Sequence, residues 1–483
     1  MPIYEKLMGN PFVDAGICGI CEWLGRSVQP EQITTADLEK VVNDVAPMMQ
    51  TDAGWGNLHS LFPNSVLTNA AYSKCNRVEL LKKVCQKYLD TIQEMDQTGD
   101  CMGCGRRYAN EQPYYIRDLH ANCMKCDNKK DPKPFLLSKS HVPLTGSGAL
   151  RNFFPIFTEG APYCSACALA IQLCPLTLVA SGEKFLTLHS NSWRALRSWA
   201  RICVSEVRQQ ELQQDITGCY NPGFVDPRNG LFYMARKMVQ FQEMHTDESI
   251  AMQVYYFTNY GQEPKLEILY MPESVFTFLR VVYQSEFKAA WLEIVRSGYK
   301  KVKWDRVQSE EDYKNNPNSV YENLLQNRSI LGFFLNRRAR KPRGNWELLS
   351  LYLKEVREMS DLRLNALKRV GDFVAESIEK TNKVGRLRDL ERARGYPECR
   401  NILRYVIRDR IRQGEDEPLF SLDDYVKHLF PEPSDHRTYW SETRDLLVFR
   451  IYEKLHGWLV ANDAVDEEDD ESDQITDGSQ EGI

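Results

Sequence analysis

The sequence predicts a mixed α+β fold: a largely helical N-terminal domain with an inserted cysteine-rich region, followed by a C-terminal helical bundle. Three observations support this fold class. Pairs of cysteines are concentrated between Cys101 and Cys174. Residues 250–260 are rich in aromatic residues and read as a strand, with residues 265–271 as its hairpin partner. From Trp346 onward, apolar residues recur every three or four positions, which is typical of amphipathic helices.

The length suggests two or three domains, because 483 residues are many for one hydrophobic core. We expect an N-terminal domain over residues 1–345, whose cysteine-rich region is 101–175. A helical bundle should follow over residues 346–462. The acidic tail, residues 463–483, is expected to be disordered.

The first hundred residues should be mostly helical. An apolar helix is expected around residues 17–24, and the Thr34-Thr-Ala-Asp37 run is typical of a capped helix start. Residues 78–92 have helical periodicity, and the Arg-rich residues 193–213 are expected to form another helix. Two further helices are expected around residues 275–283 and 289–295.

Three C-x2-C pairs lie within about seventy residues, a spacing that lets two thiolates share one tetrahedral Zn²⁺. Gly105 follows the first pair and favours a tight turn. The third pair precedes an apolar run and is therefore expected at a helix start. This layout predicts a treble-clef-like zinc region. The pairs are Cys101 and Cys104, Cys123 and Cys126, and Cys164 and Cys167.

Three pairs compete for one four-ligand site. The compact solution joins Cys101 and Cys104 with Cys123 and Cys126. The longer pairing joins Cys101 and Cys104 with the helix-start pair. Loop-closure entropy does not exclude this pairing, because the entropic cost of closing a loop grows slowly with loop length. In the longer solution the second pair could bind another metal with His120 and His141, or form a structural loop. A fourth pair, Cys18 and Cys21, is expected to pack as small apolar residues.

Charge is distributed unevenly along the chain. The net charge is −6, but the ten acidic residues of 463–483 leave the rest at +4. Residues 331–412 hold 21 Lys or Arg against 11 Asp or Glu. Such a bias fits a polyanionic partner, and the acidic tail could compete for it. Solvated helix faces would produce the same bias.

Two segments are candidate nucleic-acid-binding sites. A Gly146-Ser-Gly148 loop allows close backbone approach, and Arg151 and Asn152 after it could donate to phosphates or base edges. The densest basic segment, residues 336–344, is expected to be a loop. Its candidate residues are Arg337, Arg338, Arg340, Lys341 and Arg343.

The sequence contains no recognisable catalytic motif, so we do not expect an enzyme. The sequence contains no run of eighteen apolar residues, so no transmembrane helix is expected. The N-terminus lacks the features of a signal peptide. Many cysteines without a secretion signal indicate reduced thiols and a cytoplasmic location.

Four segments, in this order, resemble the Cst-type large subunit of type I-B CRISPR interference (Cascade) complexes. They cover roughly the first 180 residues; beyond them only the layout of a mixed domain before a helical bundle is similar. The segments are Gly9-Asn-Pro-Phe-Val-Asp-Ala-Gly16, Cys101-Met-Gly-Cys104-Gly-Arg106, Gly146-Ser-Gly with Asn152-Phe-Phe-Pro155, and Tyr163-Cys-Ser-Ala-Cys167 continuing to Pro175.

The resemblance implies a non-catalytic subunit that recognises the protospacer-adjacent motif in double-stranded target DNA and aids R-loop formation. The implied partners are crRNA, the backbone and small subunits, and a helicase-nuclease or a transposition protein. It also implies that Cys101, Cys104, Cys164 and Cys167 form one zinc site. Cys123 and Cys126 depart from the pattern. Relatives produce a small subunit from an internal start, a role that Met359 could serve here; otherwise Met359 would be a core residue within a helix.

Two other classes of protein remain possible from the residues alone. A zinc-dependent regulatory protein acting alone would also combine cysteine pairs with basic helices, and it should bind nucleic acid tightly by itself. A thiol-redox enzyme would use C-x2-C pairs as dithiols, but the sequence lacks the expected βαβ context.

Overall fold

The computed structural model describes most of the chain, and the structural statements below concern the described residues only. These are residues 2–50, 58–63, 65, 67–68, 76–92, 101–105, 137, 141–145, 161–240, 250–260, 265–414, 417–431 and 439–462. The predicted disordered tail, residues 463–483, lies outside them.

The chain forms two compact units, Met1–Glu273 and Ser274–Ile483. The boundary therefore precedes the predicted one at 345/346. Aromatic packing explains the difference, because residues on both sides of 346 share one core. The rings of Phe278 and Phe334 lie 5.9 Å and 5.5 Å from the ring of Tyr352. Residues 274–345 thus fold with the C-terminal helices.

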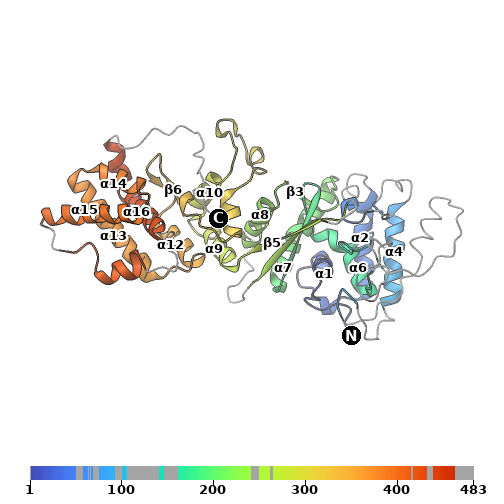
Figure 1. The fold of residues 1–483 in the computed structure, drawn as a ribbon. Coiled ribbons are helices and arrows are strands. Elements are labelled where there is room, and N and C mark those ends of the chain that lie inside the picture. The colour runs from blue at the N-terminus through green and yellow to red at the C-terminus, as the bar shows by residue number, and fades with distance from the viewer. Residues whose placement is uncertain are drawn as a thin grey trace. The chain divides into compact units, whose positions relative to one another are not determined.

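The first unit combines helices with one five-stranded sheet (Figure 1). The predicted helices at residues 78–92 and 193–213 and the hairpin partner at 265–271 are confirmed. The helices are α1 (Pro11–Leu24), α2 (Thr35–Val45), α4 (Arg77–Ile92), α6 (Ser165–Leu173), α7 (Trp193–Gln213) and α8 (Pro227–Gln240), with short 3-10 turns η1 (Pro30–Gln32), η2 (Ala46–Gln50), η3 (Leu58–Ser60) and η5 (Cys174–Thr177). The strands are β1 (Val179–Ser181), β2 (Lys184–Ser190), β3 (Tyr220–Phe224), β4 (Met252–Thr258) and β5 (Lys265–Met271).

The sheet has the order β3-β1-β2-β4-β5, and only the β1–β3 pair is parallel. Its two faces are covered by different helices, because side chains alternate along a strand. Phe257 on β4 meets Phe12 of α1, with ring centroids 5.0 Å apart. On β2, Leu186 faces α8, where a Cβ on Gly230 would lie 3.1 Å from its side chain.

Helix α1 is the central element of the first unit. Twelve of its 14 residues are buried, as expected for a helix that is apolar over most of its surface. It approaches α6 so closely that a Cβ on Gly16 would lie 1.9 Å from the carbonyl oxygen of Ala170. Cys18 and Cys21 lie buried within α1, which confirms their predicted packing role. This contact positions α6, and with it the third cysteine pair.

The predicted cap at Thr34 is confirmed. Its hydroxyl accepts a hydrogen bond from the backbone N–H of Asp37, and the Asp37 carboxylate accepts one from the N–H of Thr34. These reciprocal bonds satisfy two backbone donors at the start of α2.

The second unit is mostly helical. The predicted helices near 275–283 and 289–295 are confirmed, as is the helical pattern after Trp346. Its elements are α9 (Glu273–Tyr283), α10 (Lys288–Ser297), η6 (Trp304–Arg306), η7 (Glu310–Asp312), α11 (Ser319–Leu325), η8 (Leu331–Phe334), β6 (Leu335–Asn336), β7 (Lys341–Pro342), α12 (Trp346–Glu355), α13 (Asp361–Thr381), α14 (Val384–Arg392), α15 (Tyr396–Arg412), the π-helical turn η9 (Asp424–Leu429) and α16 (Tyr439–Ala461).

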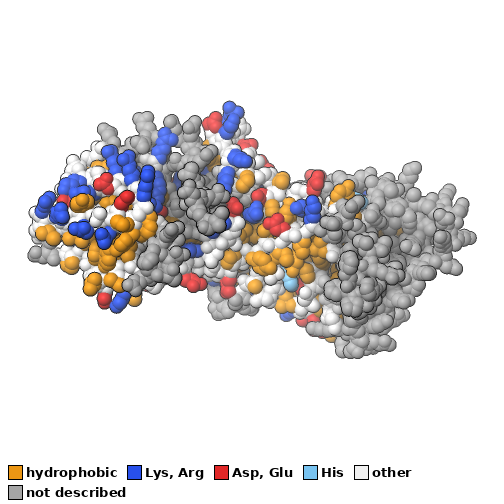
Figure 2. Space-filling view, in the orientation of Figure 1, with side chains coloured by type: hydrophobic (Ala, Val, Ile, Leu, Met, Phe, Trp, Pro, Cys, Tyr) orange, Lys and Arg blue, Asp and Glu red, His pale blue; other side chains and the backbone are white. Residues whose placement is uncertain are grey.

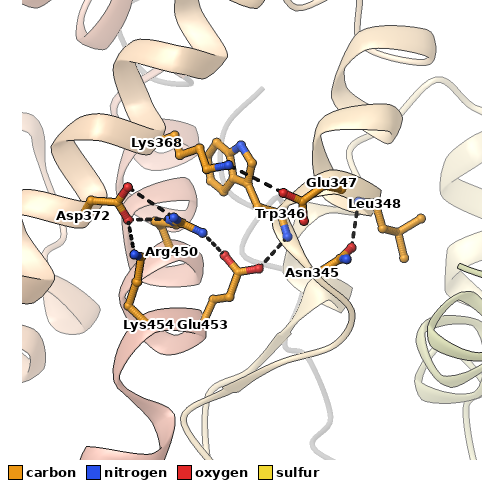
Figure 3. A network of polar contacts seen from close by, with 9 residues as sticks. All are labelled: Asn345, Trp346, Glu347, Leu348, Lys368, Asp372, Arg450, Glu453 and Lys454. Carbon is orange, nitrogen blue, oxygen red and sulfur yellow. Dashed lines mark hydrogen bonds and ion pairs between the residues drawn. The ribbon is translucent and has the colours of Figure 1, made fainter.

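A polar network ties α12, α13 and α16 together (Figure 3). The Arg450 guanidinium donates to the Asp372 carboxylate at 2.6 Å and also pairs with Glu453. Glu453 in turn accepts a hydrogen bond from the backbone N–H of Trp346 at 2.7 Å, at the first turn of α12. The network therefore links the start of the bundle to its last helix.

Met359 lies between α12 and α13, directly before Ser360, the N-cap of α13. It is buried, and its backbone N–H donates to the carbonyl of Leu353 at 2.9 Å. It is a core residue but not part of a helix. No helix among the described residues is long and apolar enough to cross a membrane.

Candidate metal centre

The first cysteine pair forms a tight turn. The Gly105 N–H donates to the Cys101 carbonyl at 2.7 Å, and Gly105 has a φ of +64°, a value that glycine adopts without strain. The Gly103 N–H points at the Cys101 sulfur, with the nitrogen 3.3 Å from Sγ. This geometry agrees with the turn predicted from Gly105.

The third pair lies at the start of α6, as predicted. Cys164 has extended backbone angles and is the N-cap residue, so Cys167 is in the first turn of the helix. The backbone N–H of Cys164 donates to the Cys101 sulfur at 3.1 Å. Cys101 therefore accepts two N–H bonds, from Gly103 and Cys164. Such bonds favour the thiolate over the thiol.

The fold brings the two pairs together. The sulfur atoms of Cys101, Cys104, Cys164 and Cys167 all lie within 4.8 Å of one another, and all four residues are buried. The Cys104 and Cys164 sulfurs are 4.0 Å apart. Four sulfurs at 2.3 Å from one tetrahedral Zn²⁺ would be separated by about 3.8 Å. The donor set and its spacing therefore fit a structural zinc site.

The four thiols perturb one another strongly. The Cys104 thiol raises the pKa of Cys101, but hydrogen bonds from the other two thiols and from the Cys164 N–H outweigh it and lower this pKa to about 7. Hydrogen bonds with Cys101 and Cys104 raise the pKa values of Cys164 and Cys167. One thiolate in the cluster thus opposes ionisation of the others. A cation at the centre would remove this opposition, because metal binding favours deprotonated ligands.

Close packing holds the turn against α1 and α6. A Cβ on Gly103 would lie 2.7 Å from the Cβ and 2.8 Å from the Sγ of Cys167, so this position requires glycine. Asn10 caps α1 and also donates, through its side-chain amide, to the Met102 carbonyl at 3.5 Å and the Tyr163 hydroxyl at 3.4 Å. Sequence reasoning did not find these positioning roles; the Asn-Pro pair at the start of α1 was the available signal.

The structure describes only part of the predicted site. Cys123, Cys126 and His120 lie outside the described residues, as do the Gly146–Gly148 loop, Arg151 and Asn152. Among the described residues, the four-cysteine cluster is the only group of His, Cys, Asp and Glu found with metal-binding geometry. That cluster corresponds to the longer of the two predicted pairings.

The basic segment forms a small hairpin, not the predicted loop. Strands β6 and β7 pair antiparallel, because Leu335 and Asn336 can register with Pro342 and Lys341. Arg340, in the turn, donates two hydrogen bonds of 2.9 Å to the carboxylate of Glu391.

Two other arginines of the hairpin also contact neighbouring groups within the second unit. Arg337 pairs with Asp445 at 2.8 Å, and Arg343 donates to the carbonyls of Phe333 and Leu335. Lys341 is exposed, while Arg338 is half-buried. Arg337, Arg340 and Arg343 therefore bind the protein itself.

Comparison with known families gives one match. Residues 117–179 match the sequence model of a family described as CRISPR-associated protein (Cas_CXXC_CXXC). The match indicates a CRISPR-associated protein. The matched range is a small part of the 483-residue chain; it contains Cys164 and Cys167 together with Cys123 and Cys126. The comparisons with curated proteins and with solved structures gave no match.

Proposed function

We propose that this chain is the non-catalytic large subunit of a crRNA-guided type I-B CRISPR complex. In this role it recognises the protospacer-adjacent motif in target duplex DNA, aids R-loop formation, and docks a helicase-nuclease or a transposition protein. The observation that carries the proposal is the match of residues 117–179 to a CRISPR-associated family, which includes Cys164 and Cys167 of the four-cysteine cluster.

The metal centre has a structural role in this proposal. Zinc held by Cys101, Cys104, Cys164 and Cys167 would fix the turn at residues 101–105 against α6, and it supplies no reactive group because all four positions are protein ligands. Residues 106–160 connect the two halves of the centre. The proposal assigns duplex reading to this connection, which contains Arg151 and Asn152.

A short reader suffices because guide pairing supplies most of the sequence specificity in such complexes. The protein then needs a contact to a few base pairs of duplex and a basic path for the displaced strand. The basic bias of residues 331–412 agrees with the second requirement.

The test is target binding by the complex of crRNA and backbone subunits, with and without this chain. The DNA duplexes share one protospacer and differ only in the flanking bases. We expect tight binding to need this chain and to depend on the flanking bases. Arg151→Ala and Asn152→Ala should then remove that dependence. Equal binding by the complex without this chain would overturn the proposal and favour a zinc-dependent regulator that acts alone.

A further inference from the structure

A cluster of exposed arginines covers α14 and α15 of the second unit, and Figure 2 shows Lys and Arg side chains gathered there. We call it the arginine face. All of its arginines are exposed, and so is Tyr405, at 42%. Its residues are Arg388, Arg392, Arg400, Arg404, Arg408 and Arg412, together with Tyr405.

Arginines of this face differ from those of the β6–β7 hairpin. Arg340 is held by two hydrogen bonds to Glu391, and Arg337 by Asp445. Within the described part of the chain, none of the six arginines of the arginine face forms an ion pair. Their charge is therefore available to a ligand.

Helical spacing aligns four of these arginines. Arg400, Arg404, Arg408 and Arg412 recur at every fourth residue of α15, so they form one row with steps of about 6 Å along the axis. Such a row can contact successive phosphates of a strand that runs along the helix.

The rings of Tyr405 and Tyr396 lie beside arginines of α14 and α15. The Arg386 guanidinium lies 4.6 Å from the Tyr405 ring centroid and that of Arg408 lies 5.8 Å from it. Arg400 lies 5.8 Å from the ring of Tyr396. Stacked guanidinium and phenol groups present flat surfaces on which unpaired bases can stack.

The helix that carries the row is packed against the rest of the second unit. The opposite side of α15 is buried through Cys399, Leu403 and Val406. Asp409 anchors α15 to the start of α14, because its carboxylate pairs with Lys383 at 2.7 Å and with Arg386 at 3.4 Å. The Arg386 guanidinium, which stacks on Tyr405, is thus also held by its ion pair with Asp409.

The type of cation favours nucleic acid over an acidic protein surface. Of the ten cationic residues between 383 and 412, nine are Arg. Arginine binds phosphate through a planar fork and stacks on rings, whereas lysine acts as a point charge. The exposed ring of Tyr405 among the arginines favours a single strand over a duplex, whose bases are already stacked.

We propose that the arginine face binds single-stranded nucleic acid, with phosphates on the Arg400–Arg412 row and a base stacked at Tyr405. This inference rests on the proposed function, which calls for a single-strand path. It places that path on α14 and α15 and not on the hairpin.

The test measures binding of the purified full-length chain to fluorescein-labelled oligo(dT), oligo(U) and a DNA duplex by fluorescence anisotropy at several salt concentrations. The triple variant Arg400→Gln, Arg404→Gln, Arg408→Gln should weaken single-strand binding by at least about tenfold. Its salt dependence, d log K/d log[salt], should become shallower by about 2, since each lost phosphate contact contributes about 0.7. Equal losses for oligo(dT) and oligo(U) would mean that the face binds single-stranded DNA and RNA alike. A larger loss for one of them would identify that type of strand as the ligand.

A matched variant controls for lost charge. Lys301→Gln, Lys303→Gln, Arg306→Gln removes three exposed cations from the same unit, away from α15, and should change affinity less than about threefold. Tyr405→Ala should weaken binding about tenfold, whereas Tyr405→Phe should keep it, because the ring and not the hydroxyl stacks. Unchanged melting temperatures show that the variants fold.

Equal losses in the α15 and control variants, or unchanged binding by Tyr405→Ala, would overturn the inference and leave simple charge attraction. The result is separable from the proposed function. If the complex needs this chain for motif-dependent duplex binding while the α15 variants bind single strands normally, only the inference fails. If the complex does not need the chain but the α15 variants lose single-strand binding, only the proposed function fails.

Discussion

The sulfur atoms of Cys104 and Cys164 lie 4.0 Å apart, although 60 positions separate the two residues in the sequence. This distance is about twice that of a disulfide and close to the separation of two thiolates on one Zn²⁺. Cys104 belongs to a turn and Cys164 to a helix N-terminus, so the metal centre joins two elements that share no local structure.

Zinc content tests this centre directly. We expect the purified chain to retain zinc through dialysis, and Cys164→Ser to lose one equivalent, because three thiolates bind Zn²⁺ less well than four. Cys85→Ala is the control: Cys85 is equally buried, in α4, but outside the cluster. Elemental analysis of the three proteins gives the stoichiometry. Loss of zinc from the Cys85 variant would mean that general destabilisation, not ligation, controls metal content.

The same measurement addresses the pairing. The double variant Cys123→Ser, Cys126→Ser should keep the zinc bound by the described cluster. A fall from two equivalents to one would identify a second site. Complete loss would contradict the assignment of Cys164 and Cys167 to the same ion as Cys101 and Cys104.

A methyl group at Gly103 should disturb the centre. The Cβ of Gly103→Ala would lie 2.7 Å from that of Cys167, so the turn must move away from α6. We expect a loss of about 1–3 kcal/mol in unfolding free energy, typical of overpacking, together with weaker zinc retention. Gly385→Ala is the control, since nothing lies within 4 Å of its Cβ position. Urea denaturation compares the two; equal stabilities would show that the turn accommodates the methyl group.

The hairpin contact between Arg340 and Glu391 should stabilise the second unit. Both side chains are 14% exposed, so Arg340→Gln leaves a mostly buried carboxylate without its charged partner. The expected cost is about 1–3 kcal/mol in unfolding free energy. Lys341→Gln removes the same charge from an exposed neighbour and should cost less than about 0.5 kcal/mol. Thermal and urea unfolding measure both; similar costs would contradict a specific role for the pair.

The acidic tail should weaken binding to nucleic acid. Deletion of residues 463–483 removes ten carboxylates and changes the formal charge from −6 to +4. We expect tighter oligo(dT) binding at low salt and a smaller difference at high salt, because ions screen the repulsion. A variant with the tail's acidic residues changed to Asn and Gln keeps the length and separates charge from bulk. Equal affinities of the intact and truncated chains would exclude competition by the tail.

Much of the fold could be predicted because local patterns determine local structure. Apolar periodicity located α4 at Arg77–Ile92, and the residues after Cys164 indicated a helix start there. Capping chemistry identified the start of α2 at Thr34. Strands β1, β2 and β3 were not predicted, because short strands buried by tertiary contacts have little periodic signal of their own.

The sequence alone determined the chemistry of the cysteines and the basic bias of residues 331–412, since both follow from residue type and spacing. Tertiary structure decided which groups meet. It joined Cys101 and Cys104 to Cys164 and Cys167 through the contact of α1 with α6. It also paired the charge of Arg340 with that of Glu391, while Arg400, Arg404, Arg408 and Arg412 of α15 stayed exposed. Spacing along the chain cannot reveal such partners, because a thiolate or a carboxylate becomes a neighbour only when the helices pack.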